Sequence, residues 1–342
     1  MGRAGTVIDG GTVLLPGQEY PRTHFFGHSM FLGVSSRIEP ASNYLDYRNA
    51  FIAARGAGGL TGIGHSGEWG GDVAAAVLLA DNLIDFIEVF AFRTPNYDLW
   101  YEALDAGFRV APTAGTDYPC GAGGVPPGTP RFYARVDGPL TPEAWVSAVR
   151  ADRTFVTNGP VLRLAVEGSG MGEELVLDQP SLVALKATVL FDHERDSVRA
   201  VEVVRNSEVI EAHTVPTAPG RFDIETMVSV EEASWLAVRT FGSRLRAEGP
   251  WRNGFAHSAP VWIRVAGRPP LSAARRARAR IAAWMNRLDT LEAQLSDEDR
   301  RDEIELSGGT DGITAEALTA SRLVLIWQVQ QARVAWLRRL AG

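Results

Sequence analysis

The sequence predicts a mixed α/β protein that continues into an all-β segment and ends in two helices. Strand-like and helix-like segments alternate from Thr12 to Asp117, short alternating segments without helices follow, and two long helical stretches come last. Alternating strands and helices are typical of an α/β unit with a parallel sheet. The 342 residues are enough for two or three domains. We therefore expect an α/β domain over 1–160, a small β-sandwich over 161–266 and a helical hairpin over 267–342.

Four polar side chains follow the predicted strands of the first domain. The run TVLL leads into PGQE and delivers Glu19, and FFGHSMFLGV forms a second strand that carries His28. After a helix over 45–60, GLTGIGHSG forms a strand that ends at His65, and RVAPTAGTDYP forms one that ends at Asp117. The carboxyl ends of parallel strands form the edge that carries the active site in such folds. We expect these four groups to meet at that edge.

Carboxylate and imidazole ligands without sulfur suit Zn, Mn or Fe. A single histidine at a strand end is commonly structural, but four such groups at one predicted edge favour a metal site. The predicted ligands are therefore Glu19, His28, His65 and Asp117, and Glu19 and Asp117 are also the candidate catalytic residues.

Other polar residues support two interpretations each. Glu88 lies inside the apolar run DFIEVF, where a carboxylate is either paired or metal-bound, or points to solvent. Arg153 and Asn158 in RTFVTNGP are candidate substrate-binding residues, although Thr, Asn and Gly are also ordinary turn residues. His24 reads as an exposed loop histidine and His257 as a domain-packing histidine.

The second half of the chain changes its pattern. VALKATVLF, AVEVVRN, SWLAVRTF and PVWIRVAG alternate with turn residues, as in a small β-sandwich. Two helices then form an antiparallel hairpin. The second helix carries apolar residues at three-to-four spacing, and we expect this face to pack. These residues are Leu323, Ile326, Trp327, Val334 and Leu337.

Composition excludes several classes of function. The net charge of −7 provides no basic field for nucleic acid, and no apolar run reaches the roughly 18 residues of a membrane span. The first residues do not have the pattern of a signal peptide, and we expect a cytoplasmic location by default. No Gly-x-Ser-x-Gly, Walker-type or Gly-x-Gly-x-x-Gly motif occurs, so serine-hydrolase, nucleotide and dinucleotide sites are not predicted.

Taken in order, the motifs GQE, GH, GHSG, FIEV, TAGTD and RTFVTNGP resemble those of CehA/McbA-type metallohydrolases of the PHP (polymerase and histidinol phosphatase) superfamily. SWLAVR and FAHSAPVWIRVAGRP are similar to their C-terminal half, so the resemblance covers nearly the whole chain. It implies a distorted α/β barrel with a metal cluster at the strand ends. By position, it implies that Glu19 is the bridging carboxylate, that His28 and His65 share its metal, and that Asp117 helps to hold another metal.

The superfamily begins with a His-x-His motif, and this chain contains none. The resemblance therefore implies an incomplete PHP-type barrel that lacks two strands at its N-terminal side. Two explanations remain open: a true start upstream of this Met, or natural loss of the segment. In both cases a sheet edge is exposed, and we expect self-association through it.

The resemblance implies hydrolysis of an ester, carbamate or phosphoester bond in a small-molecule substrate. A metal-bound water loses its proton and attacks, and Glu19, His28 and His65 form a three-ligand site with an open position. Asp117 is then a general base or part of a second metal site.

The alternative is a catalytically degraded binding or scaffold protein that works through its sandwich and hairpin. Trp284, Trp327 and Trp336 support it, because they offer large apolar contacts. The loop from Pro119 to Pro130 is either an active-site lid or a linker.

Overall fold

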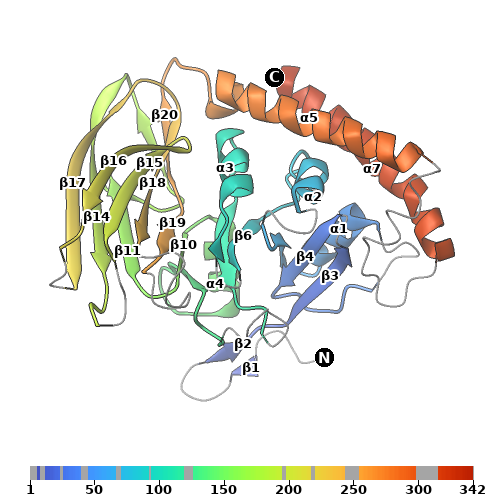
Figure 1. The fold of residues 1–342 in the computed structure, drawn as a ribbon, viewed down its shortest axis with the longest axis horizontal. Helices are drawn as coiled ribbons and strands as arrows, with labels where there is room; N and C mark the ends of the chain where they lie inside the picture. The colour runs from blue at the N-terminus through green and yellow to red at the C-terminus, as the bar shows by residue number, and fades with distance from the viewer. Residues whose placement is uncertain are drawn as a thin grey trace. The chain divides into compact units, whose positions relative to one another are not determined.

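The chain is a mixed α/β protein (Figure 1). It divides into two compact units. Unit 1 comprises Met1–Ile87, Asp137–Ser147 and Arg278–Gly342, and unit 2 comprises Glu88–Val136 and Ala148–Ala277. These interleaved units do not follow the boundaries at 160 and 266 that the sequence predicts. The computed structural model describes residues 6–7, 12–23, 26–39, 45–66, 71–91, 94–118, 126–194, 198–216, 220–242, 254–297 and 315–341. These residues form six α-helices and several sheets, and no closed barrel.

The sheet of unit 1 has mostly antiparallel neighbours. Strand β4 pairs antiparallel with both β3 and β5, whereas β5 pairs parallel with the first residues of β6. A short antiparallel ribbon, β1 and β2, precedes the sheet. The strands are β1 (Thr6–Val7), β2 (Val13–Leu14), β3 (Gly17–Thr23), β4 (Gly27–Leu32), β5 (Leu60–Gly64) and β6 (Phe86–Ala91).

The expectation of a parallel sheet is therefore wrong for the strands that carry Glu19 and His28. Three residues connect Thr23 to Gly27, whereas a parallel neighbour needs a crossover of about a dozen residues or more. The chain must turn back, and β3 and β4 form a hairpin. Because β4 also runs opposite to β5, its first residues lie beside the last residues of β5, and His28 stands opposite Gly64.

A glycine fixes the contact between β5 and β6. Gly62 stands opposite Phe86 in the parallel register, and the ring of Phe86 lies over it. A Cβ atom at residue 62 would come within 2.3 Å of that ring. Both residues are buried, so the close approach of the two strands requires glycine at this position.

Helix α1 (Tyr47–Gly56) holds the beginning of β4. Its N-cap residue Asp46 accepts a hydrogen bond from the Asn49 N–H, which satisfies one of the free donors of the first turn. The Tyr47 hydroxyl donates to the Gly27 carbonyl at 2.6 Å. This contact anchors the backbone immediately before His28.

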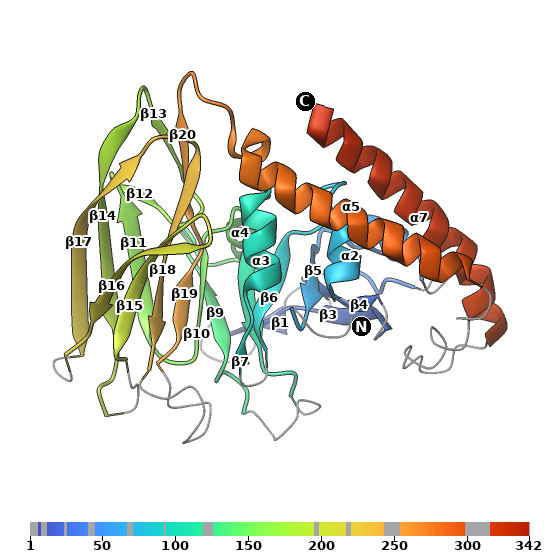
Figure 2. The ribbon, with the colours of Figure 1, turned by 45° about the horizontal axis from the view of Figure 1, so that its top comes forward.

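Helices α5 (Arg275–Ser296) and α7 (Ala315–Ala341) lie side by side as the predicted antiparallel pair (Figures 1 and 2). Trp284 of α5 packs on Trp336 of α7 with ring centroids 5.0 Å apart. Arg333, which precedes Trp336 in α7, pairs with Asp289 and Glu292, which follow Trp284 in α5. The two helices therefore run in opposite directions. The Trp336 indole also donates to the Ala76 carbonyl in α2 (Gly71–Leu78), which ties the hairpin to unit 1.

Four of the five apolar residues of α7 that were expected to pack are exposed, and Ile326 is half-buried. Leu323 and Trp327 are 72% and 46% exposed, and Val334 and Leu337 are also exposed. The helix is apolar on most of its circumference, and a different face is buried. The buried residues are Leu325, Val329, Ala332 and Trp336. None of the described helices combines the length and the apolar character that a membrane crossing requires.

Unit 2 begins with the rest of β6 and a short α/β segment. Strand β6 pairs antiparallel with β7 and also neighbours β8. The elements of this segment are β7 (Thr94–Pro95), α3 (Asp98–Asp105) and β8 (Ala111–Gly115), and α4 (Pro142–Arg150) crosses the boundary between the units.

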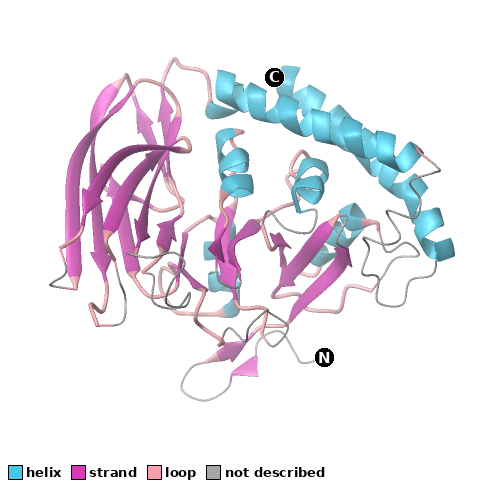
Figure 3. Ribbon diagram, in the orientation of Figure 1, coloured by secondary structure: helices cyan, strands magenta, loops and turns pink. Residues whose placement is uncertain are grey.

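The remainder of unit 2 is two sheets around one hydrophobic core (Figure 3). The larger sheet has the order β13-β20-β18-β19-β10-β9, and β15 and β16 join it at β18. Its strands are β9 (Arg131–Ala134), β10 (Thr154–Thr157), β13 (Glu174–Leu177), β15 (Ala200–Arg205), β16 (Glu208–Thr214), β18 (Ser234–Phe241), β19 (Ala256–Ser258) and β20 (Val261–Val265). The smaller sheet consists of β12 (Ser169–Gly170), β11 (Val161–Val166), β14 (Ser181–Leu190) and β17 (Arg221–Val230).

Alternating burial in β11 and β14 shows why this sequence forms a sandwich. Every second residue of these strands faces the shared core, and the others face outward. The sheets also recruit β9 and β10, which precede the predicted start of the sandwich at residue 161. A single 3₁₀ turn (Leu271–Ala273) leads from β20 to α5.

Candidate metal centre

Three of the four predicted ligands meet in unit 1. Glu19 lies in β3, His28 is the second residue of β4, and His65 directly follows β5. The pairing of β3 with β4 shifts register between Glu19 and Arg22, which re-aims the side chains of the bulged strand. With His28 opposite Gly64, the hairpin and the end of β5 converge on one point.

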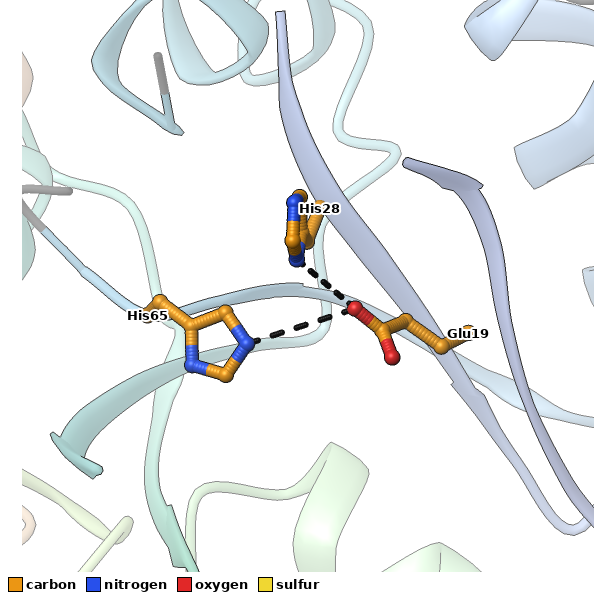
Figure 4. A group of neighbouring side chains, drawn as sticks. All are labelled: Glu19, His28 and His65. Carbon is orange, nitrogen blue, oxygen red and sulfur yellow. Dashed lines mark ion pairs between the residues drawn. The ribbon is translucent and has the colours of Figure 1, made fainter. Parts of the chain in front are cut away.

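The cluster is compact (Figure 4). Glu19 Oε1 lies 2.7 Å from His28 Nδ1 and 4.0 Å from His65 Nε2. One ligand atom from each residue lies within 4.8 Å of the other two. The side chains of His65 and His28 are 6% and 11% exposed, whereas that of Glu19 is 30% exposed. The site is therefore buried on its histidine side and accessible beside the carboxylate.

The donor atoms fit a small divalent metal. Zinc binds His nitrogen and carboxylate oxygen at about 2.0–2.2 Å, which in tetrahedral geometry separates two ligand atoms by roughly 3.3 Å. The observed 2.7 and 4.0 Å lie on either side of that value, and the three ligand atoms lie within 4.8 Å of one another, so the group can hold one ion. Two histidines and one carboxylate are a donor set suited to Zn, Mn or Fe.

The electrostatics of the cluster keep Glu19 ionised. The hydrogen bond with His28 lowers the pKa of the Glu19 carboxyl, and the charges of His28, Arg22 and His65 lower it further. Burial opposes this shift but does not cancel it. Arg22 Nη1 lies 3.6 Å from Glu19 Oε2, on the exposed side. An ionised carboxylate is the form that binds a cation.

The backbone at His65 is strained. Its φ of +52° lies in the left-handed region, which glycine adopts most readily and which costs other residues about 1 kcal/mol or more. Such strain is concentrated at functional sites, where the surrounding fold enforces it. Here it turns the chain at the end of β5 and places the ring beside Glu19.

Asp117 is described by the structure, but it is not part of the group formed by Glu19, His28 and His65. Asp117 belongs to unit 2, two residues beyond β8, and it shares the left-handed backbone of His65 with a φ of +50°. Glu88 is also in unit 2 and is buried. A Cβ added to Gly115 would lie 2.6 Å from Glu88 Oε1, so this carboxylate points into the protein and not to solvent.

The two candidate substrate-binding residues have separate roles in unit 2. Asn158 Oδ1 accepts from the Phe255 N–H, and the Asn158 N–H donates to the Phe255 carbonyl, so this side chain fastens two backbone segments. Arg153 lines a cavity beside β9 and β10. His24 and residues 119–125 of the predicted lid or linker loop lie outside the described residues.

Two neighbours of the cluster were not predicted. Arg22 stands opposite His28 because of the bulge in β3, and a bulge has no signal in this sequence. Ser66 follows His65, and its buried hydroxyl makes no hydrogen bond with any described residue. Buried polar atoms usually have a partner, and a bound ligand or water would supply one here.

Comparison with known proteins gives no match: no protein-family model matches the chain, and no curated protein and no solved structure does so. The resemblance in its motifs therefore stays a prediction, and the geometry of the cluster is the basis for a functional assignment.

Proposed function

We propose that this chain is a metal-dependent hydrolase that acts on an ester, carbamate or phosphoester bond of a small molecule. The observation that carries the proposal is the convergence of Glu19, His28 and His65 within 4.8 Å, from three different strands or strand ends. Donors from residues 9 to 46 positions apart in the sequence thus converge on one point, which is the arrangement that a catalytic metal needs.

Each of the three residues offers one atom to the proposed metal. His28 offers Nδ1 and His65 offers Nε2 from the buried side, while the Glu19 carboxylate closes the set from the accessible side. Bound there, a Zn, Mn or Fe ion supplies an activated water and a Lewis acid for hydrolysis. Arg22 adds a positive charge beside Glu19, which favours an anionic group of a substrate at the open side.

The proposal includes an incomplete PHP-type barrel as the fold of the first half. The order of the motifs from GQE to RTFVTNGP supports it. In that arrangement Asp117 acts as a general base or helps to hold a second metal, and its strained backbone at a strand end matches that of His65.

The test begins with the full chain, dialysed against a chelator and reloaded separately with Zn, Mn or Fe. Each form is assayed with 4-nitrophenyl acetate, a 4-nitrophenyl carbamate and bis(4-nitrophenyl) phosphate. We expect hydrolysis of at least one substrate to require added metal. We expect Glu19→Gln and His65→Asn each to abolish it, because asparagine keeps the left-handed backbone of residue 65 while removing the imidazole.

The matched control is His213→Asn. His213 Nε2 lies 2.8 Å from Glu211 Oε1, so it is also a histidine beside a carboxylate, but no third ligand accompanies it among the described residues. This variant should keep wild-type activity. Unchanged turnover in Glu19→Gln would contradict the proposal.

A binding or scaffold role is the second candidate, and the exposed apolar stripe on α7 favours it. Leu323, Trp327, Val334 and Leu337 are exposed along one face of this helix. Contiguous exposed apolar surface commonly marks an interaction site. Metal content per chain, measured by plasma mass spectrometry after dialysis without chelator, separates the candidates: a hydrolase retains about one ion, and a scaffold retains none.

A further inference from the structure

A cavity of about 380 Å³ lies in unit 2, where β9 and β10 meet β11. Its volume falls within the range of small-molecule sites, roughly 300–1,000 Å³. Tyr133 and Phe155 form one wall, and they stack with centroids 5.0 Å apart and an interplanar angle of 16°. Arg131 donates to the Tyr133 hydroxyl and holds this ring in place. Met171 adds an adaptable apolar contact to the lining.

The strand register places two arginines beside the aromatic pair. Phe155 stands directly opposite Tyr133, and the Arg135 N–H donates to the Arg153 carbonyl two residues further along. Side chains two residues apart lie on the same face of a strand. The aromatic pair and the pair Arg135 and Arg153 therefore share one face of the β9–β10 ribbon, and all four residues line the cavity.

Arg135 and Arg153 stand directly opposite each other where they line the cavity. Like charges directly opposite each other destabilise a sheet unless an anion offsets them. Glu173 offsets one charge: it pairs with Arg135, and its pKa is lowered first by the Gly170 N–H and then by Arg135 and Arg153. A third arginine, Arg163, is exposed on β11, lines the same cavity and forms no ion pair with a described residue.

We propose that this cavity binds a small aromatic carboxylate, with its ring against Tyr133 and Phe155 and its carboxylate toward Arg153 and Arg163. An aromatic face provides stacking for a flat ligand. A guanidinium offers a planar pair of donors that matches a carboxylate. Arginines line the cavity, and Arg163 forms no ion pair with a described residue, which favours an anion over a neutral ring.

The experiment measures binding to the full chain by isothermal titration calorimetry with three probes. 2-Naphthoate has both the ring and the charge, 2-naphthamide has the ring without the charge, and cyclohexanecarboxylate has the charge without the aromatic ring. We expect saturable binding of one 2-naphthoate per chain, and at least tenfold weaker binding of each of the other two probes.

Variants locate the site. Arg163→Gln should weaken 2-naphthoate about tenfold, because it removes one charged partner from an exposed position where folding is not affected. Phe155→Leu should weaken it several-fold by removing the stacking face. The matched control is Arg268→Gln, which removes the same charge from another exposed arginine of unit 2 that does not line the cavity. Equal affinity for 2-naphthoate and 2-naphthamide, or an Arg163→Gln variant that binds like Arg268→Gln, would overturn the proposal, as would the absence of saturable binding.

This site is independent of the proposed hydrolase activity. All residues of the cavity lie in unit 2, and Glu19, His28 and His65 lie in unit 1. His65→Asn should therefore bind 2-naphthoate like wild type, and Arg163→Gln should retain metal like wild type. Loss of 2-naphthoate binding in His65→Asn would contradict the assignment to this cavity.

Discussion

Each unit of the molecule holds histidine beside polar partners, and the two environments differ in what they leave for a ligand. In unit 1, His28 and His65 share Glu19 as a neighbour, and the carboxylate side of the group is accessible. In unit 2, His257 of β19 is completely buried among aromatic rings. The histidines of unit 1 can bind a metal in place of their present hydrogen-bond partners, whereas His257 is inaccessible to one.

The hydrogen bonds of His257 use both ring nitrogens. Nδ1 lies 2.9 Å from the Ser258 carbonyl, which only accepts, so Nδ1 carries the proton. Nε2 then accepts from the Tyr101 hydroxyl at 2.6 Å. Arg239 donates to the same hydroxyl and to Glu202, which continues the chain of bonds toward the surface.

The difference between the two environments separates a structural histidine from a candidate ligand. Burial lowers the pKa of His257 to about 3, so this ring stays neutral through the physiological range. Its role is to satisfy buried polar groups, as a fully connected network must. The sequence predicts His65 as a ligand and His257 as a packing residue from their places in the chain, but the partners that fix these roles come from distant segments.

The largest expected effect is on metal affinity. His65→Asn should weaken Zn binding more than 100-fold, because loss of even an outer partner of a ligand costs about 10–100-fold and His65 is a proposed direct ligand. Competition with a chromophoric chelator measures this change. His257→Asn should bind Zn like wild type. If both variants lose affinity equally, the contrast between the two histidines fails.

The next effect is on stability. His257→Asn should lower the free energy of unfolding by about 3 kcal/mol in metal-free protein, because it leaves a cavity among Trp100 and Tyr101 and removes the partner of the Tyr101 hydroxyl. Urea denaturation followed by tryptophan fluorescence measures it, and Trp100 and Trp235 pack beside Tyr101 as reporters in unit 2. A loss below 1 kcal/mol would show that the network is not tightly packed.

The pKa of His257 should make the free energy of unfolding depend on pH. Because the folded-state pKa of about 3 lies below the ordinary value of 6.5, the unfolded chain binds more protons between these values, and stability falls as the pH falls from 6.5. We expect a slope of about 1 kcal/mol per pH unit below pH 6 that His257→Asn lacks. The window from pH 6.5 to 5 lies above the ordinary pKa of 4.5 for the Glu19 carboxyl. Parallel slopes in the two proteins would refute this origin.

The smallest expected effect is on the stability of the His65 variant, compared with that of the His257 variant. In metal-free protein His65→Asn should change the free energy of unfolding by less than about 1 kcal/mol, because asparagine accepts a φ of +52° and the lost ring faces a partly accessible carboxylate. The same substitution thus has a small cost at residue 65 and a large one at residue 257. Equal losses at both positions, measured by urea denaturation, would mean that His65 is also a packing residue.

The sequence predicts the strands that carry His28 and His65, whereas Glu19 lies inside β3, which is separate from the predicted TVLL strand. The sequence also predicts that the three residues meet, but for a reason that the structure corrects. The expected common edge of parallel strands does not form between β3, β4 and β5. The short connection from Thr23 to Gly27 already requires a hairpin, so this correction was accessible from the sequence. The register shift after Glu19 was not, because a bulge depends on pairing with a partner strand.

Long-range contacts explain why the domain boundaries were harder to predict. Gln328 of α7 accepts from the Arg48 N–H and donates to the Leu45 carbonyl, so the C-terminal helix completes the first unit. Nothing in the local pattern around residue 328 identifies these partners. The spacing of apolar residues in α7 likewise predicts a helix, but it does not indicate which apolar face is buried when most faces are apolar.

The close approach of β5 and β6 has a consequence for natural variation of this chain. The Phe86 ring occupies the space that any side chain at residue 62 would need. Variants with alanine at residue 62 should therefore occur only together with a smaller residue at 86, and changes at these two positions should covary. Because β5 ends immediately before His65, the packing of residues 62 and 86 also limits which substitutions can shift the position of His65 during evolution.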